Sequence, residues 1–150
     1  MTQHSYFQIF KKTTLPWYHQ KDGLHFECTG CGGCCTGSPG YVWVNETEIE
    51  QIAAHLNMDI PSFTERYLIK VDERYSLKED PENYDCPFLE NKKRCTIYFI
   101  RPRQCRTFPW WRENLSSEEA WKEAAKRCEG IHPQAPLVSI EEIEKNLQQN

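Results

Sequence analysis

The hydrophobic positions of this chain change period from one segment to the next. Residues 41–44, YVWV, are β-branched or aromatic and predict a short strand. The following residues, NETEIEQIAAHL, fit a helix that begins at a capping box of Asn45 and Glu48. Its apolar face consists of Ile49, Ile52, Ala53 and Leu56. Strand and helix periods in neighbouring segments indicate a mixed α and β fold.

A second helix and a second strand follow in the sequence. Residues 61–68, PSFTERYL, fit a helix with a capping box of Ser62 and Glu65. Its inward-facing residues are Phe63, Tyr67 and Leu68. RYSLKE, residues 74–79, predicts a short strand. Residues 86–98, CPFLENKKRCTIY, predict a β-hairpin, because two apolar arms flank the polar turn ENKKR.

Three further helical segments come after the hairpin. RPRQCRTF, residues 101–108, fits a helical turn with proline at its first position. Ser116 with Glu119 starts a helix that runs to about Cys128, and Ser139 with Glu142 starts a last amphipathic helix. The apolar face of that last helix consists of Ile140, Ile143 and Leu147. Residues 1–25 show no clear periodicity.

Composition predicts one domain with a thin hydrophobic core. The chain has 150 residues, the usual size of one domain, and no linker divides it. Apolar residues make up 39% and include eight cysteines, so cross-links or metal would help the core. We therefore expect a small, loop-rich, metal-stapled α+β domain over residues 1–150, with several short helices and a small antiparallel hairpin or sheet. Its core would span about 17–131, and a C-terminal helix would lie within 132–150.

Charge and hydropathy argue against two classes of partner. The net charge of −4 argues against nonspecific binding to nucleic acid. No apolar run has the length of a membrane helix, and the start, MTQHSYFQIFKKTTLPWY, lacks the pattern of a signal peptide. We therefore expect a cytoplasmic protein. In that reducing compartment, clustered cysteines serve more often as metal ligands or redox groups than as disulfides.

Four cysteines fall within the glycine-rich loop at residues 26–40. They are Cys28, Cys31, Cys34 and Cys35, spaced C-x2-C-x2-C-C. In a C-x2-C pair both thiolates reach one metal, and glycines allow the backbone angles that such a loop needs. The x2 spacing of the first three also resembles the start of a ferredoxin-type run. Because neighbouring side chains tend to point apart, Cys34 and Cys35 favour two adjacent metals or one multinuclear cluster.

The other four cysteines are dispersed along the chain. They are Cys86, Cys95, Cys105 and Cys128. Eight thiols suffice for two all-cysteine tetrahedral sites, or for a four-ligand cluster with thiols left over. Metal shared by the two sets would hold distant segments together and couple metal binding to folding. The alternatives are a set of disulfides and, for Cys128 above all, a small buried hydrophobic residue.

Two histidines and a basic stretch lie near these cysteines in sequence. His25 and His132 could each replace a thiolate, although a solvated or structural histidine is the commoner case. The basic stretch has seven cationic residues and no acidic one: Lys92, Lys93, Arg94, Arg101, Arg103, Arg106 and Arg112. It fits an ordinary solvated surface, charge compensation for thiolates, or an anion-binding face.

An aromatic run follows Cys105. Phe108, Trp110 and Trp111 fit either a shield that limits water at a metal site or plain core packing. Core packing is the simpler interpretation.

Three quoted segments together resemble a known family. FECTGCGGCC, CPFL and CTIYFIRPRQCRTFP are similar, in this order, to the YkgJ-type cysteine-cluster proteins, also called the CxxCxxCC zinc- or iron-chelating domain. The resemblance runs from about Trp17 to Ile131. It implies that the family's eight cysteines fall on Cys28, Cys31, Cys34, Cys35, Cys86, Cys95, Cys105 and Cys128. Its arginine-proline segment falls on Arg101, Pro102, Arg106, Phe108 and Pro109.

Three functions are compatible with the sequence. The first is a metal-binding protein whose cysteine cluster is largely structural, with zinc or an iron–sulfur cluster. The second is an enzyme that uses the centre for redox or methyl-transfer chemistry, because flagellin lysine N-methylases carry a similar motif; the chain has no G-x-G-x-x-G-type loop to support methyl transfer. The third is a metal-handling or interaction module. The spacing does not decide between zinc and iron.

Overall fold

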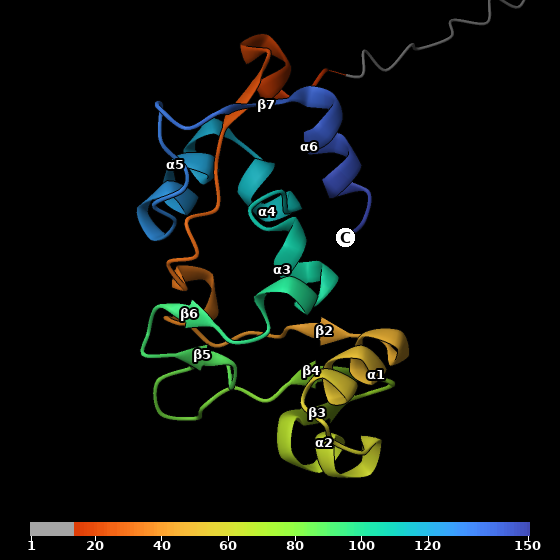
Figure 1. Cartoon of the computed structure of the whole chain (residues 1–150). Coiled ribbons are helices and arrows are strands. Elements are labelled where there is room, and N and C mark those ends of the chain that lie inside the picture. The colour runs from red at the N-terminus through yellow and green to blue at the C-terminus, as the bar shows by residue number, and fades with distance from the viewer. Residues whose placement is uncertain (1–13) are drawn as a thin grey trace, which may run out of the picture.

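In this computed structural model, which describes residues 14–150, three antiparallel strands in the order β2–β4–β3 form the sheet of one half of the molecule (Figure 1). These are β2 (Trp43–Val44), β3 (Leu68–Val71) and β4 (Arg74–Leu77). Leu68 lies opposite Leu77, and Trp43 opposite Ser76. The helices α1 (Glu46–His55) and α2 (Ile60–Tyr67) bury their apolar faces in the same cluster as these strands.

The other half combines both ends of the described chain. β1 (Gly23–His25) pairs antiparallel with β7 (Leu137–Ser139). The 3₁₀ helix η1 (Trp17–Lys21) precedes this pair in sequence, and α6 (Ile140–Leu147) follows it. The helices α4 (Arg112–Leu115) and α5 (Glu118–Arg127) complete this half. Figure 1 shows this half above the three-stranded sheet.

Short elements connect the two halves. They are η2 (Gly33–Cys35), the hairpin of β5 (Leu89–Glu90) and β6 (Arg94–Cys95), η3 (Tyr98–Ile100) and α3 (Arg103–Thr107). α3 stands between the upper and lower halves in Figure 1. The fold is thus a mixed α+β arrangement of short helices and small antiparallel sheets, which confirms the predicted fold class.

Two helix starts agree with the sequence and two do not. The capping box of Asn45 and Glu48 is present at α1, and Ser139 caps α6. The predicted capping box at Ser62 is wrong, because the N-cap of α2 is Asp59, three residues earlier, and Asp59 accepts the Ser62 amide at 2.9 Å. The predicted cap at Ser116 is also wrong. Ser117 caps α5, while the Ser116 hydroxyl donates to the Glu113 carbonyl at the end of α4.

Strands and turns differ from the sequence expectation in length and number. The hairpin at 86–98 is confirmed, but its paired arms are two residues each. The strand predicted at 41–44 is limited to Trp43 and Val44. Pro102 is the N-cap of α3 rather than its first helical residue. β1, β3 and β7 were not predicted, because two of them form one long-range pair and the third continues directly from a helix.

The buried apolar side chains of the described residues fall into two clusters. The sheet cluster consists of Val44, Ile49, Ile52, Ala53, Phe63, Leu68, Leu77, Phe88 and Ile97. The terminal cluster consists of Tyr18, Leu24, Trp110, Leu115, Trp121, Ala124, Cys128, Ile131 and Ile143. Each contains nine buried residues, which is a small core for a chain of this length. What joins the two clusters therefore matters for stability.

Within residues 14–150, every helix is too short or too polar to cross a membrane.

Candidate metal centre

All eight cysteines line one cavity of about 120 Å³. They are Cys28, Cys31, Cys34, Cys35, Cys86, Cys95, Cys105 and Cys128. Every one of them is a free thiol. The structure therefore brings together the tight quartet and the dispersed set, which the sequence separates by long intervals.

Different elements carry these thiols to the cavity. Cys34 and Cys35 end η2, Cys95 ends β6, Cys105 lies within α3, and Cys128 follows α5. The remaining three lie in loops: Cys28, Cys31 and Cys86. Cys28 and Cys34 are exposed, whereas Cys128 is buried. The set thus extends from the surface into the interior.

The cavity lies at the boundary between the two hydrophobic clusters. Cys128 and Trp110 of the terminal cluster line it, together with Leu77 and Ile97 of the sheet cluster. Trp110 is buried and stacks on Trp121, with ring centroids 5.3 Å apart. The same aromatic side chain thus contributes to the core and to the cysteine cavity. Of the two roles expected for this aromatic run, core packing is observed directly.

The main chain already joins the quartet to the dispersed cysteines. The Cys86 amide donates a 2.8 Å hydrogen bond to the Cys35 carbonyl. Beside it, the Thr36 hydroxyl donates to the Asp85 carboxylate, which also pairs with Lys92. Hydrogen bonds from Lys92 and Thr36 lower the pKa of Asp85. This network fixes the approach of the loop at 28–36 to the start of the hairpin.

Close packing at Gly33 brings the cysteine-rich loop against the end of α5. A Cβ atom at Gly33 would lie 2.6 Å from the carbonyl oxygen of Arg127, and 3.5 Å from the Cys31 sulfur. Real Cβ atoms do not approach a carbonyl so closely, so this contact requires glycine. Arg127 directly precedes Cys128, and the contact therefore holds Cys128 near the quartet.

Backbone amides point at several of the sulfurs. The Gly33 amide donates to the Cys31 sulfur at 3.4 Å. The Ile97 amide lowers the pKa of Cys95, and the amides of Gly130 and Ile131 lower the pKa of Cys128, each against the larger effect of burial. Hydrogen bonds from backbone amides to sulfur favour the thiolate over the thiol. Such hydrogen bonds surround the sulfurs of many metal–thiolate sites.

Five of the thiols have a raised pKa and favour the protonated state: Cys34, Cys35, Cys95, Cys105 and Cys128. The hydrogen bond with Cys35 raises the pKa of Cys34, and the protein atoms that surround its sulfur add to this shift although the residue as a whole is exposed. The hydrogen bond with Cys34 lowers the pKa of Cys35. The hydrogen bond with Cys86 and burial outweigh that effect, and the pKa rises to about 12. Burial raises the pKa of Cys95, Cys105 and Cys128. Such thiols are protonated at neutral pH and ionise when a metal ion replaces the proton.

A guanidinium group faces this set of thiols. Arg101 lines the cavity, stacks on Tyr98 at 3.8 Å, and lowers the pKa of Cys34, Cys95 and Cys105 against the effect of burial. Burial alone would lower the pKa of Arg101, but its hydrogen bond with Tyr98 and the nearby Tyr98, Cys28 and Cys105 groups together outweigh burial and raise that pKa. The buried Nε of Arg101 has no hydrogen-bond partner within residues 14–150. Arg101 is therefore positioned to compensate negative charge in the cavity.

The basic stretch identified in the sequence divides between three locations. Lys92 and Arg94 pair with Asp85 and Glu90 on the surface. Arg101 and Arg106 line the cysteine cavity. Arg103 and Arg112 line a separate cleft, described below. The members of the stretch thus have different surroundings: surface ion pairs, the cysteine cavity and a separate cleft.

The two candidate histidines lie elsewhere. His25 Nδ1 lies 2.6 Å from the Ala135 carbonyl oxygen, and His132 Nδ1 accepts from the Gln134 amide. Neither is among the residues that line the cysteine cavity. Both have a structural contact instead, the commoner case for an isolated histidine.

The sequence does not mark three residues of the cavity as site residues. Tyr98 lines it beside Arg101, Leu77 reaches it from the end of β4, and Arg127 reaches it from the end of α5. Arg127 directly precedes a cysteine, and this adjacency was the one hint available. Leu77 and Tyr98 come from segments whose place beside the thiols depends on the tertiary fold.

The thiols surround an open volume rather than one point. Among the described residues, no three His, Cys, Asp or Glu side chains are close enough together to form a coordination group. On one side, Cys34, Cys35 and Cys86 also line a neighbouring pocket of about 200 Å³. Tyr41, Tyr84 and Trp111 contribute to that pocket as well.

Comparison with known proteins gives one family match. The family model of CxxCxxCC, described as "Putative zinc- or iron-chelating domain", matches residues 27–129. The chain is 29% identical over 104 residues to the uncharacterized protein MJ0661 of Methanocaldococcus jannaschii, which covers 69% of this chain. The chain spans 54% of the length of that relative. No solved structure matches the chain.

Proposed function

The chain belongs to the CxxCxxCC family of zinc- or iron-chelating domains, and we propose that its eight cysteines form a metal centre that cross-links the two hydrophobic clusters. The observation that carries this proposal is the arrangement of all eight free thiols around one cavity. A disulfide set is a poorer account, because none of the eight is paired with another.

The donor set fits zinc or iron rather than a hard cation. Thiolates are soft ligands that select zinc, copper(I) and iron–sulfur clusters, whereas magnesium and calcium prefer oxygen. Metal–sulfur bonds of about 2.3 Å would require the thiols to turn inward from their present positions. The glycines of the loop at 28–36 make such a movement possible. Arg101 would offset the negative charge of the thiolates.

The proposed role of the metal is structural. The sheet cluster and the terminal cluster each have nine buried residues, and both reach the cavity. Metal bound there would connect segments from Cys28 to Cys128 and add the free energy of binding to that of folding. We propose accordingly that residues 1–150 form one cysteine-cluster domain. Eight free thiols are also compatible with a reducing cytoplasm.

The metal can be identified by purification without oxygen, followed by visible absorption and by zinc and iron analysis. A colourless protein with stoichiometric zinc supports closed tetrahedral sites, and two ions per chain would support two such sites. A brown protein with charge-transfer bands and bound iron supports an iron–sulfur cluster. A folded protein that contains no metal and has eight alkylatable thiols would contradict the proposal.

A second candidate function, catalysis at the metal centre, is favoured by the neighbouring pocket. Cys34, Cys35 and Cys86 line both the cysteine cavity and that pocket of about 200 Å³, so a small molecule could reach the centre from there. A catalytic metal keeps an open coordination position, whereas a structural one is closed. Added cyanide or azide would change the absorption spectrum of a cobalt- or iron-loaded protein with an open position. An unchanged spectrum would argue against an open coordination position, and the structural role would be the one that remains.

A further inference from the structure

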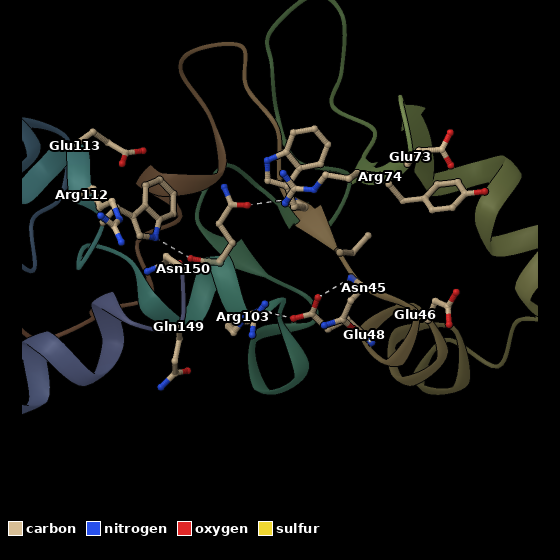
Figure 2. A pocket seen from close by; sticks show the side chains of 15 residues that line it. Asn45, Glu46, Glu48, Glu73, Arg74, Arg103, Arg112, Glu113, Gln149 and Asn150 are labelled. Atoms are coloured by element: carbon tan, nitrogen blue, oxygen red, sulfur yellow. Dashed lines mark hydrogen bonds between the residues drawn. The ribbon is translucent and has the colours of Figure 1, made fainter.

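A cleft larger than the cysteine cavity separates the two halves of the molecule on another face. Its volume is about 630 Å³, within the range of pockets that bind small molecules. Trp43, Asn45 and Arg74 line it from the half with the three-stranded sheet. Trp111, Arg112 and Asn150 line it from the other half. Figure 2 shows the side chains of this cleft.

Three guanidinium groups in the cleft have no ion pair. No carboxylate of residues 14–150 lies within ion-pair distance of Arg74, Arg103 or Arg112. Residues 1–13, MTQHSYFQIFKKT, contain neither Asp nor Glu and cannot supply a side-chain carboxylate. Guanidinium groups bind phosphate and carboxylate oxygens through parallel hydrogen bonds. The cleft therefore offers cationic donors that the protein itself leaves available.

One carboxylate that lines the cleft, Glu48, is already occupied by backbone donors. Glu48 accepts the Asn45 amide at 2.9 Å and the Arg103 amide at 2.6 Å. Its charge is thus engaged by backbone donors at the starts of α1 and α3. Figure 2 shows Glu113 toward the same end of the cleft as Arg112, and Glu46 and Glu73 toward the other end, away from Arg103. Arg103 lies between these acidic ends.

Fixed aromatic rings adjoin the arginines. The Trp111 indole nitrogen donates to the Gln104 carbonyl at 3.0 Å, which fixes the orientation of the ring. The Gln104 side chain accepts the Trp43 amide at 2.9 Å and so ties the opposite side of the cleft to α3. Trp43 already stacks on Arg74 at 4.0 Å and on Tyr41 at 4.8 Å. Trp111 is partly exposed and contacts the edge of Phe108, so it remains the ring on which a planar ligand can stack.

We propose that this cleft binds a small organic anion with a planar ring and a phosphate group, namely a mononucleotide. The phosphate binds the guanidinium groups of Arg103 and Arg112, and the base stacks on Trp111. A single-stranded nucleic acid fits less well, because it would extend past Glu73 and Glu113 and because the net charge is −4. This site is independent of the proposed metal centre, although α3 carries Cys105 to one and Arg103 to the other.

The test is calorimetric titration of the purified full-length protein with AMP, adenosine and inorganic phosphate. AMP is chosen because its single phosphate competes little for bound metal. We expect one AMP per chain with a Kd below about 1 mM. Adenosine and phosphate each lack one of the two contacts, so each should bind at least tenfold more weakly.

Matched variants assign the binding to the cleft. Arg103→Gln and Arg112→Gln should each weaken AMP binding at least tenfold. Arg66→Gln removes the same charge from α2 outside the cleft and should leave the Kd unchanged. Circular dichroism and metal content of each variant establish that it is folded, and Arg112→Gln serves if Arg103→Gln does not fold. No AMP binding, equal Kd values in all three variants, or tighter binding of a single-stranded oligonucleotide than of AMP would overturn the proposal.

Discussion

The Cys86 amide donates a 2.8 Å hydrogen bond to the Cys35 carbonyl, and thereby joins the cysteine-rich loop to the start of the hairpin. The contact is made by the main chain and does not depend on metal. It places two thiols of the cavity side by side. The main chain thus holds the segments of Cys35 and Cys86 together at the cavity.

Serine at Cys34 and serine at Cys128 should have different effects on the metal-free protein. Cys34 is exposed, so Cys34→Ser should lower metal content with little change in the stability of the metal-free form. Cys128 is only 8% exposed and belongs to the terminal cluster, so Cys128→Ser also buries a hydroxyl among apolar groups. That burial should cost the metal-free form about 1–3 kcal/mol.

The measurement for this pair is urea unfolding of both variants after removal of metal, with metal content determined before removal. The sequence alone ranks Cys128 as the weakest ligand candidate, and the cavity instead includes it with the other seven. Normal metal content in both variants would refute the common centre. Equal unfolding midpoints of the metal-free variants would refute the distinction between them.

Alanine at Gly33 should be far more harmful than alanine at Gly40. A Cβ at Gly33 would lie 2.6 Å from the Arg127 carbonyl, whereas no atom lies within 4 Å of a Cβ at Gly40. Gly33→Ala should therefore lower the free energy of unfolding by about 1–3 kcal/mol and reduce metal content, because Cys128 moves away from Cys31. Gly40→Ala should be neutral or slightly stabilising. Urea unfolding and metal analysis of the two variants decide the matter; similar results for both would contradict the close approach.

Removal of the charge at Arg101 should weaken the retention of metal. Arg101 lowers the pKa of three of the thiols, so Arg101→Gln raises those values and lets protons compete better with the ion. Metal should then dissociate at a higher pH than from the unmodified protein, with an affinity about 10–100-fold lower.

The control for this experiment is Arg94→Gln. Arg94 belongs to the same basic stretch but pairs with Glu90 at 2.5 Å on the surface. A chelator competition across a range of pH measures both variants. The same release midpoint for Arg101→Gln and Arg94→Gln would show that Arg101 has no effect on the centre.

The cap of α2 should give a pH-dependent contribution to stability. The Ser62 amide and hydroxyl lower the pKa of Asp59 in the folded chain. Its carboxylate therefore stabilises the fold above the ordinary Asp value of about 4, and this stabilisation is lost as pH falls through the lowered value. Asp59→Asn keeps a cap without a titrating group.

The quantity to measure is the difference in free energy of unfolding between the unmodified protein and Asp59→Asn. It should be constant above about pH 5 and shrink at lower pH. Metal release at low pH affects both proteins and cancels in the difference. A difference that grows as pH falls would contradict the assigned cap.

The sequence predicts local features of this fold better than long-range ones. The capping box at Asn45 and the cap at Ser139 are local signals, and both are present. Ser116 and Ser117 offer competing starts for one helix, and a helix that ends at Leu115 occupies the first of them. The pairing of Leu24 with Val138 joins segments distant in sequence, and no local pattern indicates it.

The same distinction applies to the functional residues. The eight thiols were identified by residue type and spacing, whereas their convergence on one cavity depends on the tertiary fold. The arginines of one basic stretch were visible, but their division between a cysteine cavity and a separate cleft was not. Leu77 reaches the cavity without any chemical signature in its own segment, and Tyr98 does so from a segment noted only for its cysteines and arginines.

X-ray absorption at the metal edge of the protein purified without oxygen tests the central claim most directly. We predict a first coordination shell of sulfur alone, at about 2.3 Å. A shell dominated by nitrogen or oxygen would contradict a centre built by these cysteines.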